Sequence, residues 1–288
     1  MKGNSARREN FRRFWLALTR RKIVVVCLIV ILFFTLVAIF ADVIAPYDPN
    51  KQDLFNVSAG ISKEHWLGTD SLGRDTVSRL IAGTRVSMAV GLASIFLAGI
   101  VGMLIGLVIG YVGGPLDMVV MRIADAQMAI PPLIQAMALG AVMKGGFFTV
   151  VVSIAVSTLP TYIRLMRGQV LAVKEQEYIR SSIAVGCKTP RLLLTHIFPN
   201  CLNPLIVLIT QNLGAAILTE ANLSFLGLGI APPQASWGGM VSMGYDQLLH
   251  HPELALSPGI CVILLVLAFN MVGDGLRDAL DPRLRGVK

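Results

Sequence analysis

The chain has 288 residues, of which 55% are hydrophobic and only 15% are charged. Since charged residues make up about 25% of an ordinary soluble domain, this composition excludes that class and indicates a polytopic membrane protein. The formal net charge of +8 does not indicate a nucleic-acid partner, because the basic residues gather at the ends of apolar segments. The four cysteines are scattered and form no CxxC pair, so neither a zinc site nor a disulfide framework is supported.

A basic tail precedes the first apolar segment. Residues 1–22 are rich in arginine and contain a single acid, Glu9. Residues 23–44 form an apolar run of about 33 Å if helical, which is enough to cross a bilayer and too long for a signal peptide. By the positive-inside rule the N-terminus is cytoplasmic. Residues 45–86, whose charges nearly cancel, are then expected to lie outside.

The second predicted span, 87–111, is rich in small residues. Gly102, Gly106 and Gly110 recur every four positions and so share one helix face. Such a face lets another helix approach closely, as in a packed transmembrane bundle. A phosphate-binding loop is the alternative, but no Gly-Lys-Ser/Thr ending follows.

The third predicted span, 116–142, is unusual because charged residues occupy its first turns. Arg122 and Asp125 are three residues apart and can face each other on a helix. Charges next to an apolar segment suggest a functional site, although we favour pairing among themselves or with neighbouring helices near the cytoplasmic edge. Pro131-Pro132 is expected to kink this span, so that it lines a path rather than facing lipid.

The second half alternates apolar and polar segments. Basic residues are dense in the tails and in the polar segment, whereas the loop 221–255 has none, so six spans with both termini cytoplasmic fit the charge distribution. The predicted segments are a fourth span at 147–166, the polar segment 174–200, a fifth span at 201–220, an external loop at 221–255, a sixth span at 256–273 and a cytoplasmic tail at 274–288.

The polar segment 174–200 is the long polar interruption between the last spans. Tyr178, Ile179 and Ile183 fall at helical spacing and give a short amphipathic helix. Gly186 is placed to end that helix, Thr189-Pro190 marks the start of another, and Pro199 is expected to break or kink the chain. Two interpretations remain open at this point: a helix lying on the membrane surface, or a helix that docks in a groove of a cytoplasmic partner.

Motifs of an enzyme or a nucleotide-binding protein are absent from the sequence. It contains no GxxxxGK[ST], HExxH or GxSxG pattern. His250-His251 lack a third nearby ligand, so exposed polar surface explains them better than a metal site. The remaining classes are a channel, a secondary carrier, or the membrane subunit of a transporter that another chain powers. A carrier would ordinarily show repeats and a mid-membrane acid, which are not apparent.

Four motifs carry a resemblance that covers essentially the whole chain. Residues 65–79, HWLGTDSLGRDTVSR, residues 224–238, SFLGLGIAPPQASWG, and residues 269–283, FNMVGDGLRDALDPR, are similar to signatures of ABC importer permeases of the dipeptide/oligopeptide/nickel class. The polar segment resembles that family's cytoplasmic EAA loop at Gly186 and Pro199. Here Arg180-Ser181-Ser182 replace Glu-Ala-Ala, which alters the charge presented to a partner but keeps small residues for close docking.

The resemblance implies an all-α, multi-pass cell-membrane protein with six transmembrane helices and the type I ABC importer permease fold. It also implies a second homologous permease in a heterodimer, two ATPase subunits that bind ATP and Mg²⁺, and an external solute-binding protein. This chain would bind no cofactor or metal and catalyse no reaction. Peptide is the first choice of substrate, with nickel or glutathione as alternatives and a self-contained carrier or channel as the competing class.

The candidate site residues fall into three groups. Helix-packing hydrogen bonds explain the pathway candidates nearly as well as a transport role does. The ATPase-docking candidates are Glu177, Tyr178, Arg180, Ser181, Ser182, Gly186, His196 and Pro199; the pathway candidates are Asp125, Gln127, Gln135, Gln211 and Asn212; the external motif comprises His65, Gly68, Asp70, Gly73, Arg74, Asp75 and Arg79.

Overall fold

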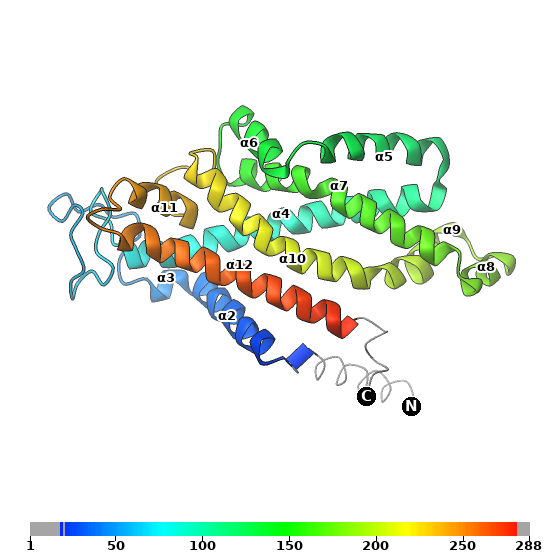
Figure 1. The fold of residues 1–288 in the computed structure, drawn as a ribbon, viewed down its shortest axis with the longest axis horizontal. Helices are drawn as coiled ribbons and strands as arrows, with labels where there is room; N and C mark the ends of the chain where they lie inside the picture. The colour runs from blue at the N-terminus through cyan, green and yellow to red at the C-terminus, as the bar shows by residue number, and fades with distance from the viewer. Residues whose placement is uncertain (1–17, 20, 281–288) are drawn as a thin grey trace.

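Long apolar segments of the sequence form the helices of an elongated bundle. The computed structural model describes residues 18, 19 and 21–280, and this part contains helices and loops but no strand. Helix α8 lies at one end of the bundle and the loop of residues 45–75, which we call the outer loop, lies at the other (Figure 1). The elements are α2 (Lys22–Ile39), α3 (Ala41–Ile44), α4 (Thr76–Val112), α5 (Gly114–Met128), α6 (Pro132–Val142), α7 (Phe147–Lys174), α8 (Glu177–Ala184), α9 (Thr189–Arg191), the π-helix η1 (Leu192–Ile197), α10 (Phe198–Phe225), α11 (Trp237–Tyr245) and α12 (Glu253–Leu280).

The third pass corrects one prediction. Instead of one kinked span over 116–142, α5 and α6 are separate helices joined by residues 129–131. Pro131 disfavours a helical conformation in the residue before it, and its ring lacks an N–H. The Gln135 side chain donates to the carbonyls of Gln127 and Ile130 (2.6 and 2.8 Å) and so satisfies groups at the end of α5. Five described helical segments are long and apolar enough to cross a membrane, and α6 is a shorter apolar helix.

Several helices extend beyond their apolar cores. Helix α4 begins at Thr76 rather than at residue 87, because the Asp75 carboxylate accepts from the Ser78 N–H (2.8 Å) and caps the helix. The outer loop therefore ends at residue 75, and the first turns of α4 lie within the segment 45–86 that we predict to be external. Helix α7 likewise continues to Lys174, past the predicted end at 166, and α12 reaches Leu280. Most of the predicted basic tails, 1–17 and 281–288, lies outside the described residues.

The glycine face of α4 packs directly on α7, as its spacing predicts. A Cβ atom added at Gly102 would lie 2.5 Å from the Tyr162 Cβ, and one added at Gly106 would lie 2.6 Å from the Ile163 carbonyl oxygen. One added at Gly110 would lie 2.9 Å from the Val170 Cβ. Because no side chain fits between the two backbones, α4 and α7 form the tightly packed centre of the bundle.

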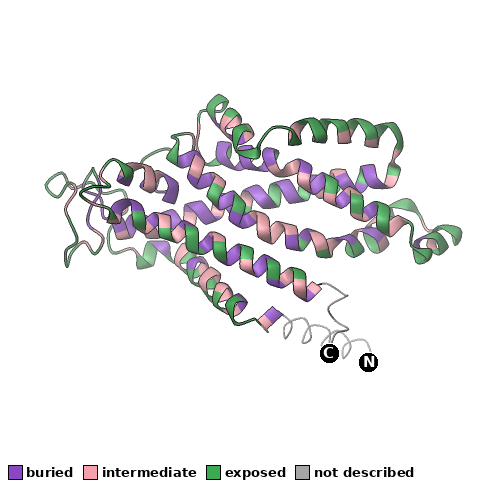
Figure 2. Cartoon of the chain, in the orientation of Figure 1, coloured by how far each residue is buried: buried purple, intermediate pink, exposed green. Residues whose placement is uncertain are grey.

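Many residues on the outside of the bundle are exposed (Figure 2), and large apolar side chains are among them. On α2, Ile29 and Phe33 are 60% and 59% exposed, and on α12 Ile263 is 59% exposed. An apolar surface this extensive is far larger than the patches of a soluble monomer. A lipid environment removes that surface from water, which agrees with the transmembrane prediction.

Candidate functional site

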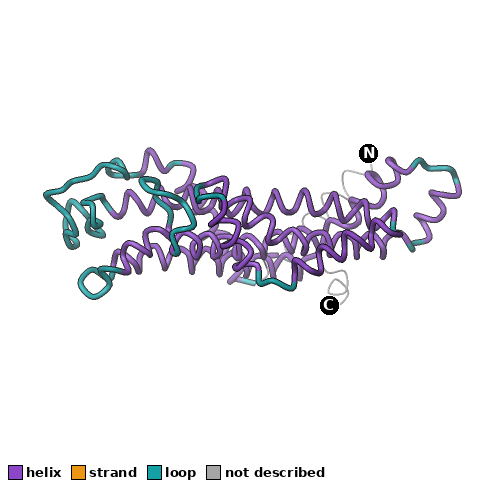
Figure 3. Tube along the Cα trace, turned by 90° about the horizontal axis from the view of Figure 1, so that it is seen from above, coloured by secondary structure: helices purple, strands orange, loops and turns teal. Residues whose placement is uncertain are grey.

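A short amphipathic helix projects from one end of the bundle, as the sequence predicts for the polar segment. Helix α8 lies beyond the ends of α7 and α10 (Figures 1 and 3). Its Ile179 side chain is fully buried and anchors the helix, whereas Tyr178 and Ile183 are 44% and 48% exposed. Val185, directly after the helix, is 90% exposed. The helix is thus fixed at one point and presents apolar groups outward.

Gly186 ends α8 in a left-handed conformation, as predicted. Its φ is +83°, which residues with a Cβ rarely adopt. The Gly186 N–H donates to the Ile183 carbonyl (2.9 Å) and the Cys187 N–H donates to the Ser182 carbonyl (3.0 Å). These two bonds form a Schellman motif and satisfy carbonyls that the helix end would leave unpaired. A Cβ at Gly186 would meet no atom within 4 Å, so the requirement for glycine within this chain is conformational.

The residues that replace Glu-Ala-Ala lie on the exposed part of α8. Arg180 pairs with Glu175, and both side chains are about two-thirds exposed (67% and 69%). Ser181 is exposed, and the Ser182 hydroxyl donates to the Tyr178 carbonyl (2.7 Å) within the helix. Among the described residues, the partner of Arg180 is therefore an exposed side chain, and Ser181 beside it in the sequence is exposed as well.

The chain returns to the bundle through helical turns. Thr189 starts α9 as predicted. Pro199 does not break the chain but lies where the continuous helical stretch changes from π- to α-helix. The turn before it is the π-helix η1, a form often found at functional sites. His196 is half-buried in η1, and its carbonyl accepts from the Asn200 side chain (2.6 Å).

The pathway candidates on α5 and α6 are bonded to neighbouring backbone or to α7. Asp125 pairs with Arg164 of α7, not with Arg122 as the spacing suggested. The Gln127 side chain donates to the Val156 carbonyl of α7 (2.7 Å). Pairing with a neighbouring helix, the interpretation we favoured for these charges, is therefore what the structure has. Arg122 has no ion pair or hydrogen-bond partner within residues 21–280.

The pathway candidates on α10 are engaged as well. The Gln211 side chain donates to Asp274 of α12 (3.1 Å), and the Asn212 side chain donates to the Tyr162 hydroxyl of α7 (3.1 Å). All these bonds connect helices of the bundle. Whether the same side chains also line the pathway stays a prediction.

The external motif folds into a network of charged and backbone groups at the start of α4. Asp70 accepts from Arg74 Nε (2.7 Å) and from the Arg74 N–H (3.0 Å), and it pairs with Arg79 Nε (3.3 Å). His65 Nδ1 lies 2.8 Å from the Asp75 carboxylate. Gly68 and Gly73 have φ of +70° and +71°, which explains glycine at both positions. Arg74 and Asp75 are almost completely buried, so this network is structural in this chain.

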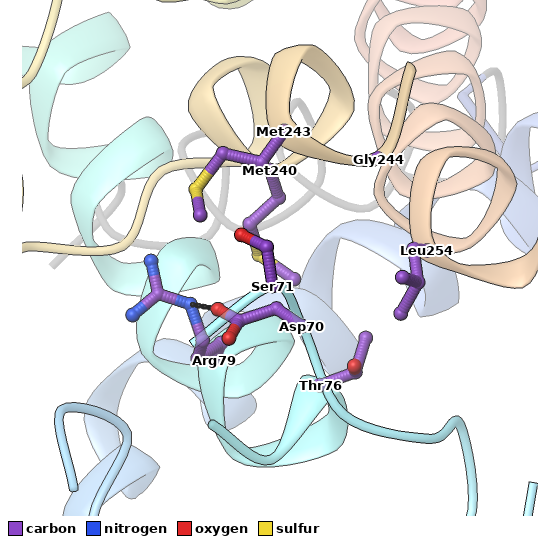
Figure 4. A pocket seen from close by; sticks show the side chains of 8 residues that line it. All are labelled: Asp70, Ser71, Thr76, Arg79, Met240, Met243, Gly244 and Leu254. Carbon is purple, nitrogen blue, oxygen red and sulfur yellow. Dashed lines mark ion pairs between the residues drawn. The ribbon is translucent and has the colours of Figure 1, made fainter. Parts of the chain in front are cut away.

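The same network ties the motif to the loop before the last pass. Arg79 Nη1 donates to the carbonyls of Pro49 (3.0 Å) and Pro233 (3.4 Å). Asp70 and Arg79 line a small cavity together with Met240 and Met243 of α11 (Figure 4). Two of the sequence motifs, at 65–79 and 224–238, thus meet in space although they are far apart in the chain.

Sequence reasoning missed two features of these sites. Arg167 makes a two-point ion pair with Asp117, so α7 carries two arginines that hold α5. Glu220 is fully buried; Oε1 accepts from the Ser224 hydroxyl (2.8 Å) and Oε2 has no partner in the described chain. The sequence signal for the ion pair was the closely spaced arginines Arg164 and Arg167 on α7. The glutamate inside an apolar run was a signal for the second.

Comparison with known protein families identifies the chain's class. Residues 102–286 match the family described as "binding-protein-dependent transport system inner membrane component". The chain belongs to this family. It is a permease subunit of an ABC importer in the inner membrane, a transport component rather than an enzyme, and it works with ATPase subunits and a binding protein. Residues 10–59 also match the N-terminal transmembrane domain of oligopeptide transport permease C.

Relatives of this importer permease align along nearly its whole length. It is 39% identical over 279 residues to the glutathione transport system permease protein GsiD of Pectobacterium atrosepticum, covering 96% of this chain and 93% of that protein. It is 42% identical over 264 residues to the oligopeptide transport system permease protein OppC of Bacillus subtilis, covering 92% and 87%. An inward-facing structure of the MetNI methionine ABC transporter has the same fold, with a TM-score of 0.57 at 19% identity over 70% of this chain and 96% of that one.

Proposed function

We propose that this permease forms half of a translocation pathway for short peptides, including glutathione. Support comes from its relatives, whose names specify glutathione and oligopeptide transport, and glutathione is itself a small peptide. The His250-His251 pair gives no support to nickel as the substrate, because His251 Nδ1 contacts Glu253 (3.1 Å) and no group of three or more potential ligands occurs in the described chain.

The projecting helix α8 is the observation that carries the proposed mechanism. Its anchored Ile179 and outward-facing Tyr178 and Ile183 fit a helix that inserts into a groove of another protein. ATP and Mg²⁺ bind to two ATPase subunits, whose closure moves this helix. The side chains that meet the ATPase are those of α8 and its flank, from Glu177 and Arg180 to Ser181, Ser182 and Gly186, with His196 and Pro199 behind them.

The pathway itself forms against a second, homologous permease. Helix α5 supports this arrangement, because Met118 and Ile123 are 66% and 63% exposed and Ala124 is the helix's single buried residue. Asp125, Gln127 and Gln135 lie on or next to this exposed pass, and Gln211 and Asn212 lie on α10. The outer motif, which includes His65, holds the opposite end, where the binding protein delivers substrate.

Reconstitution of the purified subunits tests this function. The permease pair, the ATPases and the binding protein are placed in proteoliposomes, and uptake of labelled glutathione and of a labelled tetrapeptide is measured with ATP. We expect uptake of at least one of them, dependent on ATP and on the binding protein. Uptake by this chain alone would instead establish a self-contained carrier or channel, and nickel uptake without peptide uptake would overturn the proposed substrate class.

A further inference from the structure

Helix α5 is held to the rest of this chain mainly by polar contacts. Ala124 is its single buried residue, whereas the adjoining α4 and α7 are packed together along their lengths. Its attachments to α7 are the Asp117–Arg167 and Asp125–Arg164 ion pairs and the Gln127 bond to the Val156 carbonyl. Few apolar contacts compete with these bonds in fixing where α5 lies.

The two ion pairs have a regular arrangement. Asp117 pairs with Arg167 and Asp125 with Arg164, so residue numbers rise on α5 as they fall on α7, as expected for antiparallel helices. The Asp117–Arg167 pair is the better shielded one, with 16% and 30% of the side chains exposed, and the guanidinium contacts both carboxylate oxygens. A two-point contact of this kind fixes orientation as well as distance.

Helix α7 also leads directly to α8. Its last residue, Lys174, is separated from α8 by Glu175 and Gln176, and the Lys174 ammonium donates to the Tyr111 carbonyl at the end of α4 (2.9 Å). A displacement of α8 therefore reaches α7 and α4 through a short, bonded connection. It reaches α5 through the two ion pairs.

We propose that Arg164 and Arg167 are positioning residues that make α5 follow α7 when the ATPase moves α8. This proposal rests on the proposed docking of α8. The arginines need not touch the substrate; they carry the movement of the packed α4–α7 pair to the exposed helix that faces the second permease. Without them the ATPase still drives α7, but α5 no longer moves with it.

The test uses the complete reconstituted importer and the Asp117–Arg167 pair, neither residue of which is a pathway candidate. The variants are Asp117→Arg, Arg167→Asp and the two combined, which restores opposite charges in exchanged positions. The matched control exchanges Arg21 and Asp278, an ion pair of 2.9 Å that joins the start of α2 to α12 without involving α5 or α7. Uptake and ATP hydrolysis are measured in the same vesicles, and their ratio is the readout.

We expect each single variant to lower the number of substrate molecules moved per ATP at least about tenfold, while ATP hydrolysis stays within about twofold. The combined variant should recover most of the ratio, and the Arg21–Asp278 exchange should leave it unchanged. Single variants with a normal ratio, or a combined variant as uncoupled as the single ones, would overturn the proposal.

A second measurement distinguishes failure of this proposal from failure of α8 docking. If α8 is not the helix through which the ATPase acts, Gly186→Leu will leave the coupling of uptake to ATP hydrolysis normal. If docking holds and only the arginine proposal fails, Gly186→Leu uncouples transport but the Asp117 and Arg167 variants do not. Should the charge-reversed variants fail to assemble, Asp117→Asn and Arg167→Gln, which remove the ion pair without placing like charges together, give the same test at residues outside the pathway candidates.

Discussion

Replacing Gly186 with leucine should uncouple transport without preventing folding. The residue has φ of +83°, and a left-handed conformation costs a residue with a Cβ roughly 1–2 kcal/mol. That energy corresponds to about a 5- to 30-fold change in the ratio of the native turn to its alternative conformations, which sets an upper limit on the loss of native turn. The loss is local, because a Cβ at this position meets no atom of the described chain within 4 Å and the packed bundle lies elsewhere. We therefore expect normal membrane insertion, and peptide uptake lower by at most a factor in that range.

The assay compares Gly186→Leu with Gly186→Asn in the reconstituted importer, measuring uptake and ATP hydrolysis together. Asparagine is similar in size to leucine but tolerates the left-handed conformation, so it should retain most of the coupling. If both variants fail equally, the space available in the ATPase groove, and not the backbone conformation, explains the glycine. A leucine variant that couples uptake to ATP hydrolysis as the native chain does would refute the role of this turn.

Three further substitutions test the structure at other points. Gly106→Leu should destabilise the purified permease by about 1–3 kcal/mol or more, seen as a lower Tm, because a Cβ there already lies 2.6 Å from the Ile163 carbonyl oxygen. Gly168→Leu is the control and should be tolerated, because a Cβ there meets no atom within 4 Å. Glu220→Ala should cost about 2 kcal/mol through a lost hydrogen bond and a cavity, whereas Glu220→Gln should stay within about 1 kcal/mol in the same measurement. Arg74→Ala removes one partner of the buried Asp70 and should lower the free energy of unfolding by about 3 kcal/mol, seen as faster proteolysis of the outer loop. Arg74→Lys should give a proteolysis rate between those of Arg74→Ala and the native chain.

The helical passes were predictable because their signal is local. Twenty apolar residues between polar ends identify a span regardless of what packs against it, and the glycine spacing of α4 identifies its packing face. The same local logic placed α8 and its end at Gly186, since helical period and a glycine stop signal need no tertiary information. Helix α4 began earlier than predicted because its first turns are polar and only the Asp75 cap marks the true start.

The charge pairs show where local reasoning ends. Arg122 and Asp125 have suitable spacing on one helix, yet Asp125 pairs with Arg164, 39 residues further on. The choice depends on which face of α5 meets α7, and that is fixed by tertiary packing. The break at residues 129–131 is similar: the two prolines predict a disturbance, but whether a helix kinks or separates depends on Gln135, whose side chain satisfies the carbonyls at the break.

The packing of this permease also constrains how movement crosses the membrane. Sliding of α4 along α7 is disfavoured, because Gly102, Gly106 and Gly110 each fit against one particular position of α7 and a shift would bring side chains into the contact. The two helices must therefore move as one body. That body begins at the charged network of the outer motif and ends beside α8, whereas the adjoining pass is broken between α5 and α6. In the proposed mechanism, a tilt imposed at α8 displaces both ends of the α4–α7 pair together, and the break between α5 and α6 is the point at which the adjoining pass can bend relative to that pair.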